Sequence, residues 1–262
     1  MLPFIDLKFI KLPMYGLSIM MGILVAGFIA NYFIKKEKKV FEDFILISTL
    51  TVAFGFIFAK ILYILVSFPI QKFFVVVWQM LTNKNEIGAG FVFYGGLFGG
   101  VLGYYIGTKI VKVKFLEYAD MYAFLIPVVH GFGRIGCFCG GCCYGIPYEG
   151  PFAVHYKNPI TSVPVNIGIF PVQLLETLLL FIVAAILIFL YVKNKKHLFI
   201  VYGFSYSVIR FFLEYLRYDS ERGQIGSLSV SQFISLLLFI FCICFYIFLF
   251  VKNKGNKVKT DD

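Results

Sequence analysis

The chain has 262 residues, of which 60% are hydrophobic, 19% aromatic and only 15% charged. This composition excludes an ordinary soluble domain, and the apolar runs are long enough to cross a bilayer. The formal net charge of +10 does not indicate nucleic-acid binding, because the lysines form short clusters between apolar runs, where they orient membrane helices.

The fold class predicted from these runs is an all-α polytopic membrane protein with about seven transmembrane helices. The spans are expected at 13–34, 43–69, 89–110, 115–136, 171–192, 198–217 and 229–251. The third is the weakest, because its many glycines suggest close helix packing or a partly re-entrant segment.

Lysine positions predict the orientation of the spans. Fourteen lysines follow spans one, three, five and seven, so the N-terminus is expected outside and the C-terminus in the cytoplasm. We expect a single integral-membrane domain over 1–262, a proline-rich extracytoplasmic cap loop at 145–170 and a basic cytoplasmic tail at 252–262. Residues 71–82, with the only tryptophan, are expected to form an interfacial helix.

The arginines need a separate explanation, because twenty lysines already supply the charge for orientation. Arg134 lies in span four, Arg210 and Arg217 lie in span six, and Arg222 follows in the next loop. Ionisable residues inside spans are costly and often mark function, although an interhelical ion pair is the structural alternative.

The spacing in YSVIRFFLEYLR places Tyr206, Arg210, Glu214 and Arg217 on one face of a helix. A guanidinium presents a planar fork of donors that suits phosphate and stays charged when partly desolvated. With Arg134, three cations are expected to converge near the outer leaflet headgroups. This predicts a site for an anionic phospholipid headgroup.

Further polar residues are expected at the same depth: Tyr15, Tyr94, His130, Gln173 and Glu176. For the two tyrosines an interfacial aromatic belt is an equal alternative to a site role. For His130, a structural hydrogen bond within the bundle is the preferred interpretation.

These motifs resemble the prolipoprotein diacylglyceryl transferases of bacterial plasma membranes over nearly the whole chain. The resemblance rests on six segments: YG at 15–16, GGLFGG at 95–100, HGFGRIGCF with the later Gly145, PVQLLE at 171–176, RFFLEYLR at 210–217 and SVSQFIS at 229–235. The resemblance implies seven spans with the N-terminus outside, a multi-pass protein of the inner membrane.

The resemblance also implies an activity. Family members transfer a diacylglyceryl group from phosphatidylglycerol to the lipobox cysteine thiol of a prolipoprotein signal peptide and release glycerol phosphate. By motif, Arg134, Arg210, Glu214 and Arg217 match the phosphate-binding and essential polar residues, and Tyr15, Tyr206 and Gly145 match other important positions. The reaction is expected to need no metal and no soluble cofactor.

The sequence departs from the family pattern at two places. Cys137, Gly140 and Cys142 stand where the family motif GR-x-GNF-x-N-x-E has asparagine, asparagine and glutamate. Tyr94 stands where a histidine, a candidate base, is common, and an unperturbed tyrosine is a poor base at neutral pH. The base therefore stays open among Tyr94, His130, Glu176 and Glu214, or there is no dedicated base.

Four cysteines crowd into the segment HGFGRIGCFCGGCCYG: Cys137, Cys139, Cys142 and Cys143. Packing of small apolar thiols is the first interpretation. A disulfide is the second interpretation, since the outer face of the membrane permits oxidation. Zinc ranks lower, because C-x-C-x2-CC lacks the paired spacing of structural sites. A thiol that takes part in the chemistry is the remaining alternative.

Three other functions stay open. A paralogue with the same phospholipid donor could use another acceptor. A non-enzymatic transporter of anionic lipids could use the arginines as a passing site, although no internal repeat or pair of broken helices is evident. An assembly subunit is the weakest alternative, because that role gives no reason for arginines inside spans.

Overall fold

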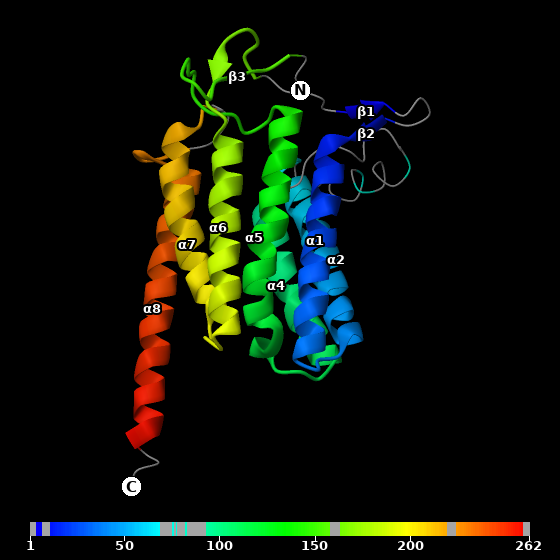
Figure 1. Ribbon diagram of the computed structural model, residues 1–262, viewed down its shortest axis with the longest axis vertical. Helices are drawn as coiled ribbons and strands as arrows, with labels where there is room; N and C mark the ends of the chain where they lie inside the picture. Colours follow the sequence, from blue (N-terminus) through cyan, green and yellow to red (C-terminus); the bar gives the residue numbers. More distant parts are fainter. Residues whose placement is uncertain are drawn as a thin grey trace. The chain divides into compact units, whose positions relative to one another are not determined.

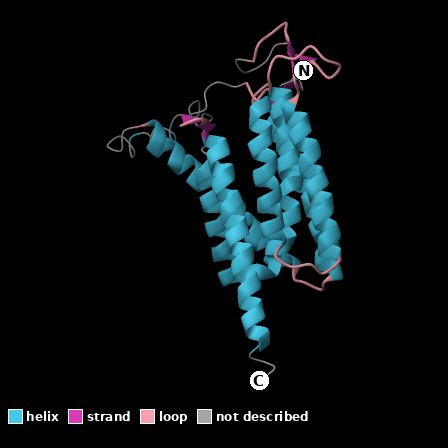
Figure 2. Cartoon of the chain, turned by 90° about the vertical axis from the view of Figure 1, so that its left-hand side faces the viewer, coloured by secondary structure: helices cyan, strands magenta, loops and turns pink. Residues whose placement is uncertain are grey.

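The computed structural model describes residues 4–6, 11–68, 75, 77, 82, 93–157, 163–218 and 224–258. Helices dominate these residues, and the strands are short two-stranded ladders (Figure 2). The chain divides into two compact units: Met1–Tyr32 with Ala119–Asp262, and Phe33–Tyr118. The predicted all-α fold is confirmed.

The first unit contains most of α1 (Met14–Lys36) and α5 (Phe115–Gly140), followed by α6 (Val172–Val192), α7 (Leu198–Leu213) and α8 (Val230–Val258). Successive helices pack as neighbours, α6 on α7 and α7 on α8 (Figure 1). Gly22 of α1 lies directly against Phe132 of α5, where an added Cβ would meet the Phe132 Cβ at 2.8 Å.

The second unit is built from α2 (Phe41–Ser67) and α4 (Phe93–Ile110), with the adjoining ends of α1 and α5. Gly95, Gly99 and Gly103 repeat every four residues along one face of α4. A Cβ at each would collide with a carbonyl oxygen of α2, on Phe58, Phe54 and Leu50 in turn. Small residues at this spacing let two helix backbones approach closely, which confirms the close packing expected for this span.

Six helices among the described residues are long and apolar enough to cross a membrane: Met14–Lys36, Phe41–Leu65, Phe115–Gly140, Val172–Val192, Leu198–Leu216 and Val230–Leu249. Large apolar side chains face outward on them, including Phe28 at 75% exposure and Phe189 at 60%. The glycine-rich α4, the weakest predicted span, is a helix but is not among the six. The chain is therefore a multi-pass membrane protein.

The segment between α5 and α6 carries a small folded cap. β3 (Val154–His155) pairs antiparallel with β4 (Gly168–Ile169), and Pro147 bridges to Ile169. Tyr156 and Val163 pack with Ile169 in a small core of their own. This cap overlaps the loop predicted at 145–170, whereas the predicted interfacial helix at 71–82 falls almost wholly outside the described residues.

Two other ladders each precede a helix. β1 (Phe4–Asp6) pairs with β2 (Lys11–Pro13) before α1, and β5 (Gln224–Ile225) pairs with β6 (Leu228–Ser229) before α8. Ser229 and Gln232 form a capping box: the Gln232 N–H donates to Ser229 Oγ and the Ser229 N–H donates to Gln232 Oε1, both at 3.1 Å. This box fixes where α8 begins.

The start of α7 is capped from a distance. Asp120, on α5, accepts hydrogen bonds from the backbone N–H groups of His197 and Leu198, at 3.0 and 2.6 Å. A carboxylate at a helix N-terminus satisfies orphan donors and opposes the positive end of the helix dipole. The contact fixes α7, which carries Arg210, against α5, which carries Arg134.

Candidate active site

Two arginine–carboxylate pairs lie among the helices of the first unit. Arg134 of α5 pairs with Glu176 of α6, Nη2 to Oε1 at 3.0 Å. Arg210 of α7 pairs with Glu214, Nη2 to Oε2 at 2.7 Å. Glu176 is only 1% exposed, so its charge is buried and depends on the arginine for compensation.

Each guanidinium has donor capacity to spare. Arg134 Nε and Arg210 Nη1 are buried and have no hydrogen-bond partner among the described residues. A second Arg210 contact, from Nη2 to Ser231 Oγ at 3.0 Å, holds the guanidinium against α8. Buried donors without partners are costly in a finished structure, so their presence indicates a ligand with acceptor oxygens.

Aromatic groups and a histidine complete the surroundings. The Tyr206 hydroxyl lies close to the Arg134 guanidinium. The ring of His130 packs edge-on against the ring of Tyr206, with centroids 5.3 Å apart, and its Nε2 lies 3.8 Å from Glu176 Oε1. The contact with a carboxylate oxygen and the Tyr206 ring fits the structural role preferred for His130.

Arg217 reaches this cluster by a route that the sequence did not predict. α7 ends at Leu213, a 3-10 turn covers Glu214–Leu216, and Arg217 is extended with φ −99° and ψ 147°. The prediction that Arg217 continues the helical face was therefore wrong. Instead, Arg217 forms an isolated β-bridge with Gly145, and its charge still acts on Arg210.

Gly145 is required at that bridge for steric reasons. An added Cβ would collide with the carbonyl oxygen of Phe170 and lie 2.9 Å from that of Leu216. The next residue, Ile146, donates its N–H to the Leu216 carbonyl at 3.0 Å. Gly145 therefore lets the strand after α5 lie directly against the end of α7.

The loop after α5 is tied to α6 by Gln173, which is 1% exposed. Its Nε2 donates to the Cys142 carbonyl at 2.9 Å and to the Tyr156 hydroxyl at 3.2 Å. Burial raises the pKa of Tyr156 to about 12, so this phenol stays neutral. Gln173 holds the loop and cap in place, and a direct contact of Gln173 with substrate stays a prediction.

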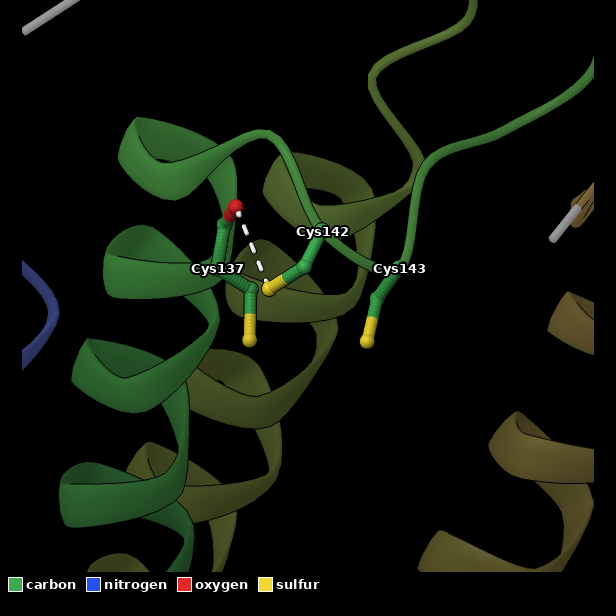
Figure 3. Close-up of side chains that lie close together, drawn as sticks. All are labelled: Cys137, Cys142 and Cys143. Atoms are coloured by element: carbon green, nitrogen blue, oxygen red, sulfur yellow. Dashed lines mark hydrogen bonds between the residues drawn. The ribbon is translucent and has the colours of Figure 1, made fainter. Parts of the chain in front are cut away.

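Three of the four clustered cysteines meet at the end of α5 (Figure 3). The Sγ atoms of Cys137, Cys142 and Cys143 all lie within 4.8 Å of one another. Cys139 is not part of the group, and none of these cysteines forms a disulfide. The Cys142 thiol also donates a hydrogen bond to the Cys137 carbonyl oxygen, at 3.7 Å.

The charge around Cys143 is unusual. The neighbouring Cys137 and Cys142 thiols, with the positive charges of Arg217 and Arg134, hold the pKa of the Cys143 thiol below its usual range, against the effect of burial. Cys143 is also left-handed, with φ 58°. A left-handed residue that is not glycine is uncommon, and such residues cluster at turns and functional sites.

Comparison with known proteins identifies the family of the chain. The family model for prolipoprotein diacylglyceryl transferase matches residues 3–248. The chain belongs to the prolipoprotein diacylglyceryl transferase family. A phosphatidylglycerol–prolipoprotein diacylglyceryl transferase of Clostridium tetani is 33% identical over 253 residues, covering 95% of this chain and 96% of the relative. Transferase 2 of Clostridium perfringens is 34% identical, covering 95% and 94%, and a Helicobacter pylori transferase is 29% identical, covering 96% and 93%.

Within this member of the diacylglyceryl transferase family, the predicted site residues fall into two groups. Arg134, Arg210, Glu214, Glu176, Tyr206, His130, Arg217, Gln173, Gly145 and Tyr15 all belong to the first unit. Tyr15, at the start of α1, is 49% exposed and lies beside the thiols and Arg134, with its Cα 3.0 Å from where a Cβ on Gly136 would stand. Tyr94 lies on the first turn of α4, in the second unit, and its role as a base stays a prediction.

Ser231 is a site residue that the sequence did not single out. It holds Arg210, and it is followed one turn later by Ser235, whose hydroxyl donates to the Ser231 carbonyl at 2.8 Å. The signal was present as SVSQFIS, three serines and a glutamine at the start of an otherwise apolar helix. Polar residues inside a membrane helix usually hydrogen-bond with another polar group, and here that group is the buried guanidinium of Arg210.

Proposed function

We propose that this protein transfers the diacylglyceryl group of phosphatidylglycerol to a cysteine thiol of a prolipoprotein and releases glycerol phosphate. Membership of the family supports the reaction, since its relatives carry the name of that transferase. The single observation in the structure that supports it best is the pair of buried guanidiniums, Arg134 and Arg210, with N–H groups that have no partner among the described residues.

The arginines suit the donor's phosphate. Arg134 Nε and Arg210 Nη1 offer donors to phosphate oxygens, while Glu176 and Glu214 each hold the Nη2 atom of one guanidinium. Arg217 adds a third positive charge close to Arg210. Fixed donors aimed at a group where negative charge develops are worth most in a site that excludes water.

The chemistry is a displacement at carbon. The acceptor thiolate attacks the terminal glycerol carbon of the diacylglyceryl group, a C–S bond forms, and the C–O bond to the phosphate breaks. The electron pair of that bond leaves with the phosphate oxygen, whose charge the arginines stabilise. The proton of the acceptor thiol must depart before or during the attack, because the thiolate is the nucleophile.

Two finer features belong to this proposal. The acceptor cysteine lies in the lipobox of a signal peptide, and the membrane is the bacterial plasma membrane, in keeping with the family's reaction. The N-terminus faces outward and the tail beyond α8 faces the cytoplasm, because fourteen lysines fall on one side of the predicted spans. The cap between α5 and α6 then covers the outer surface.

The experiment uses the full chain purified in detergent, phosphatidylglycerol, and a peptide bearing a lipobox cysteine. Peptide mass and released glycerol phosphate are both recorded, and the same peptide with serine in place of cysteine is the control. We expect a diacylglyceryl mass gain on the cysteine peptide alone, with an equal amount of glycerol phosphate.

Other outcomes contradict the proposal in different ways. Glycerol phosphate without lipidated peptide would indicate the same donor and another acceptor. If folded protein releases no glycerol phosphate but moves anionic lipids between the leaflets of reconstituted vesicles, the protein is a lipid transporter and not this enzyme.

A further inference from the structure

The thiols of Cys137, Cys142 and Cys143 have no part in the phosphate site described above. Their convergence follows from how α5 ends. The Cys142 N–H donates to the Cys137 carbonyl at 3.1 Å and the Gly141 N–H donates to the Phe138 carbonyl at 3.3 Å. With Gly141 left-handed at φ 75°, this is a Schellman motif, which brings the side chains at its two ends into contact.

In this motif the contacting positions are usually apolar, but here both carry a thiol, Cys137 and Cys142. The left-handed Cys143 then turns its own thiol toward the same space (Figure 3). Two further contacts fix the loop: the Gln173 side chain binds the Cys142 carbonyl, and Gly145 bridges to Arg217. The three sulfur atoms are thus placed by backbone geometry on a supported loop.

We infer that Cys137, Cys142 and Cys143 form a three-thiolate site for a divalent cation of the zinc type, whose fourth coordination position takes the acceptor thiol. The second half of this inference rests on the proposed function, since it names the group that the site activates. It revises the expectation that the reaction uses no metal.

The distances fit one ion. Sulfur ligands lie about 2.3 Å from zinc, so three of them in a tetrahedral arrangement are about 3.8 Å apart. The three Sγ atoms, all within 4.8 Å of one another, need to close by about 1 Å or less to reach this arrangement. This closure falls to the half-buried Cys142 and Cys143 side chains, since Cys137 is buried.

The number of ligands indicates the kind of site. Structural zinc sites have four protein ligands, whereas catalytic sites have three and keep one position for water or substrate. Among the described histidines, cysteines, aspartates and glutamates, only these three form a group of three or more that could hold one ion. Three protein ligands without a fourth are typical of a site that keeps one coordination position for water or substrate.

The surrounding charge also fits. Three thiolates with one divalent cation carry a single net negative charge, and Arg134 and Arg217 both act electrostatically on Cys143. Arg134 additionally belongs to the phosphate site, so the thiol cluster and the phosphate site share the influence of one arginine. A disulfide would use two of the three thiols and leave the third beside these cations without such compensation.

The step that this site supports is the activation of the acceptor. A thiol that coordinates a divalent cation loses its proton, here to water, and is held as a thiolate at neutral pH. An ion held by Cys137, Cys142 and Cys143 would thus supply a thiolate for attack on the glycerol carbon, as the C–O bond to phosphate breaks and its electron pair leaves with the phosphate oxygen. No side-chain base is needed, which removes the difficulty posed by tyrosine at position 94.

The first test measures metal binding without reference to activity. Full-length protein is reduced, freed of metal with a chelator and titrated anaerobically with Co2+, and the absorption of tetrahedral cobalt–thiolate is recorded. We expect about one equivalent of Co2+ to bind and Zn2+ to displace it. Protein that is folded and reduced yet gives no cobalt–thiolate absorption would overturn the inference.

Variants locate the ligands. Cys137→Ser, Cys142→Ser and Cys143→Ser are each expected to weaken Co2+ binding by more than about 100-fold, because outer-shell changes alone cost 10–100-fold. Cys139→Ser and Cys244→Ser are the matched controls and are expected to bind normally, since their thiols lie outside the cluster. Equal binding by the Cys143→Ser and Cys139→Ser proteins would overturn the ligand set.

A second measurement tests the open position. Adding the lipobox cysteine peptide to the cobalt-loaded protein should change the thiolate absorption, and the serine peptide should not. If metal-free protein lipidates the peptide at the full rate, the acceptor role is wrong although the proposed transferase stands. If the peptide changes the cobalt spectrum but no diacylglyceryl transfer occurs with metal bound, the proposed function fails and the metal site remains.

Discussion

At the scale of single residues, the site depends on the shape of guanidinium groups more than on their charge. Arg134 binds Glu176 through Nη2, while its buried Nε has no hydrogen-bond partner among the described residues. Arg210 binds Glu214 and Ser231 through Nη2, and its buried Nη1 has no hydrogen-bond partner among the described residues. A lysine offers a point charge without a fork, so it cannot bind a carboxylate and a phosphate in fixed directions at once.

We therefore expect Arg134→Lys to lower kcat/KM for diacylglyceryl transfer by about 100-fold or more, the scale of removing a preorganised transition-state donor. The measurement is initial rate of peptide lipidation in detergent. Lys195→Arg, an exposed conservative exchange, is the control and should have no effect. Near-normal activity in the Arg134→Lys protein would contradict the phosphate assignment.

Gly145→Ala is expected to reduce activity by about 10- to 100-fold through displacement of Arg217, since misplacement by about 1 Å can cost about 100-fold. Its Cβ would collide with the Phe170 carbonyl, so the bridge to Arg217 must open. Gly140→Ala is the matched control, because a Cβ there meets nothing within 4 Å. Equal rates for the two alanine variants would show that this bridge does not position Arg217.

At the scale of elements, most predicted spans agree with the helices to within a few residues, because length and hydrophobicity decide which segments are stable in lipid. The exceptions are α8, which continues to Val258 into the tail predicted from residue 252, and the end of α7. The i, i+4 spacing correctly placed Glu214 beside Arg210, but the last turn tightens and the chain becomes extended at Arg217. A contact with Gly145, far away in the sequence, decides this, so local spacing could not reveal it.

The glycine face of α4 is also an element-scale feature. Gly99→Leu is expected to destabilise the second unit by about 1–3 kcal/mol, the usual cost of overpacking, because its Cβ would collide with the Phe54 carbonyl and lie 2.6 Å from the Phe58 Cβ. Thermal unfolding in detergent measures the change.

The neighbouring Gly100→Ala is the control for this test, since a Cβ there makes only an ordinary 3.9 Å contact with Thr51 Cγ2. If Gly99→Leu unfolds at the same temperature as this control, close contact between α2 and α4 is not what stabilises the unit.

At the scale of the whole molecule, the lysine distribution makes a prediction about topology. A fluorescent protein that folds only in the cytoplasm should fluoresce when fused after Asp262. Alkaline phosphatase, which is active only outside, should be active when inserted after Phe152, a 70% exposed residue of the cap. The reverse pattern would mean that the orientation inferred from the lysines is wrong.

The amino-acid sequence by itself determined the membrane-spanning helical fold, the family and most of the residues of the arginine site. These features depend on hydrophobicity, on length and on residues whose presence inside a span is informative because it is costly. Because lysine supplies nearly all the positive charge elsewhere, Arg134 and Arg210 stand out in the sequence by residue type and position alone.

Only the tertiary structure decided which carboxylate compensates which arginine, why Gly145 must be glycine, and which thiols meet. Four cysteines within seven residues permitted packing, a disulfide or a metal site. The left-handed turn at Gly141 then brought Cys137, Cys142 and Cys143 together and left Cys139 outside. Such outcomes depend on backbone dihedral angles and on contacts between distant segments, which hydrophobic patterns and spacing do not encode.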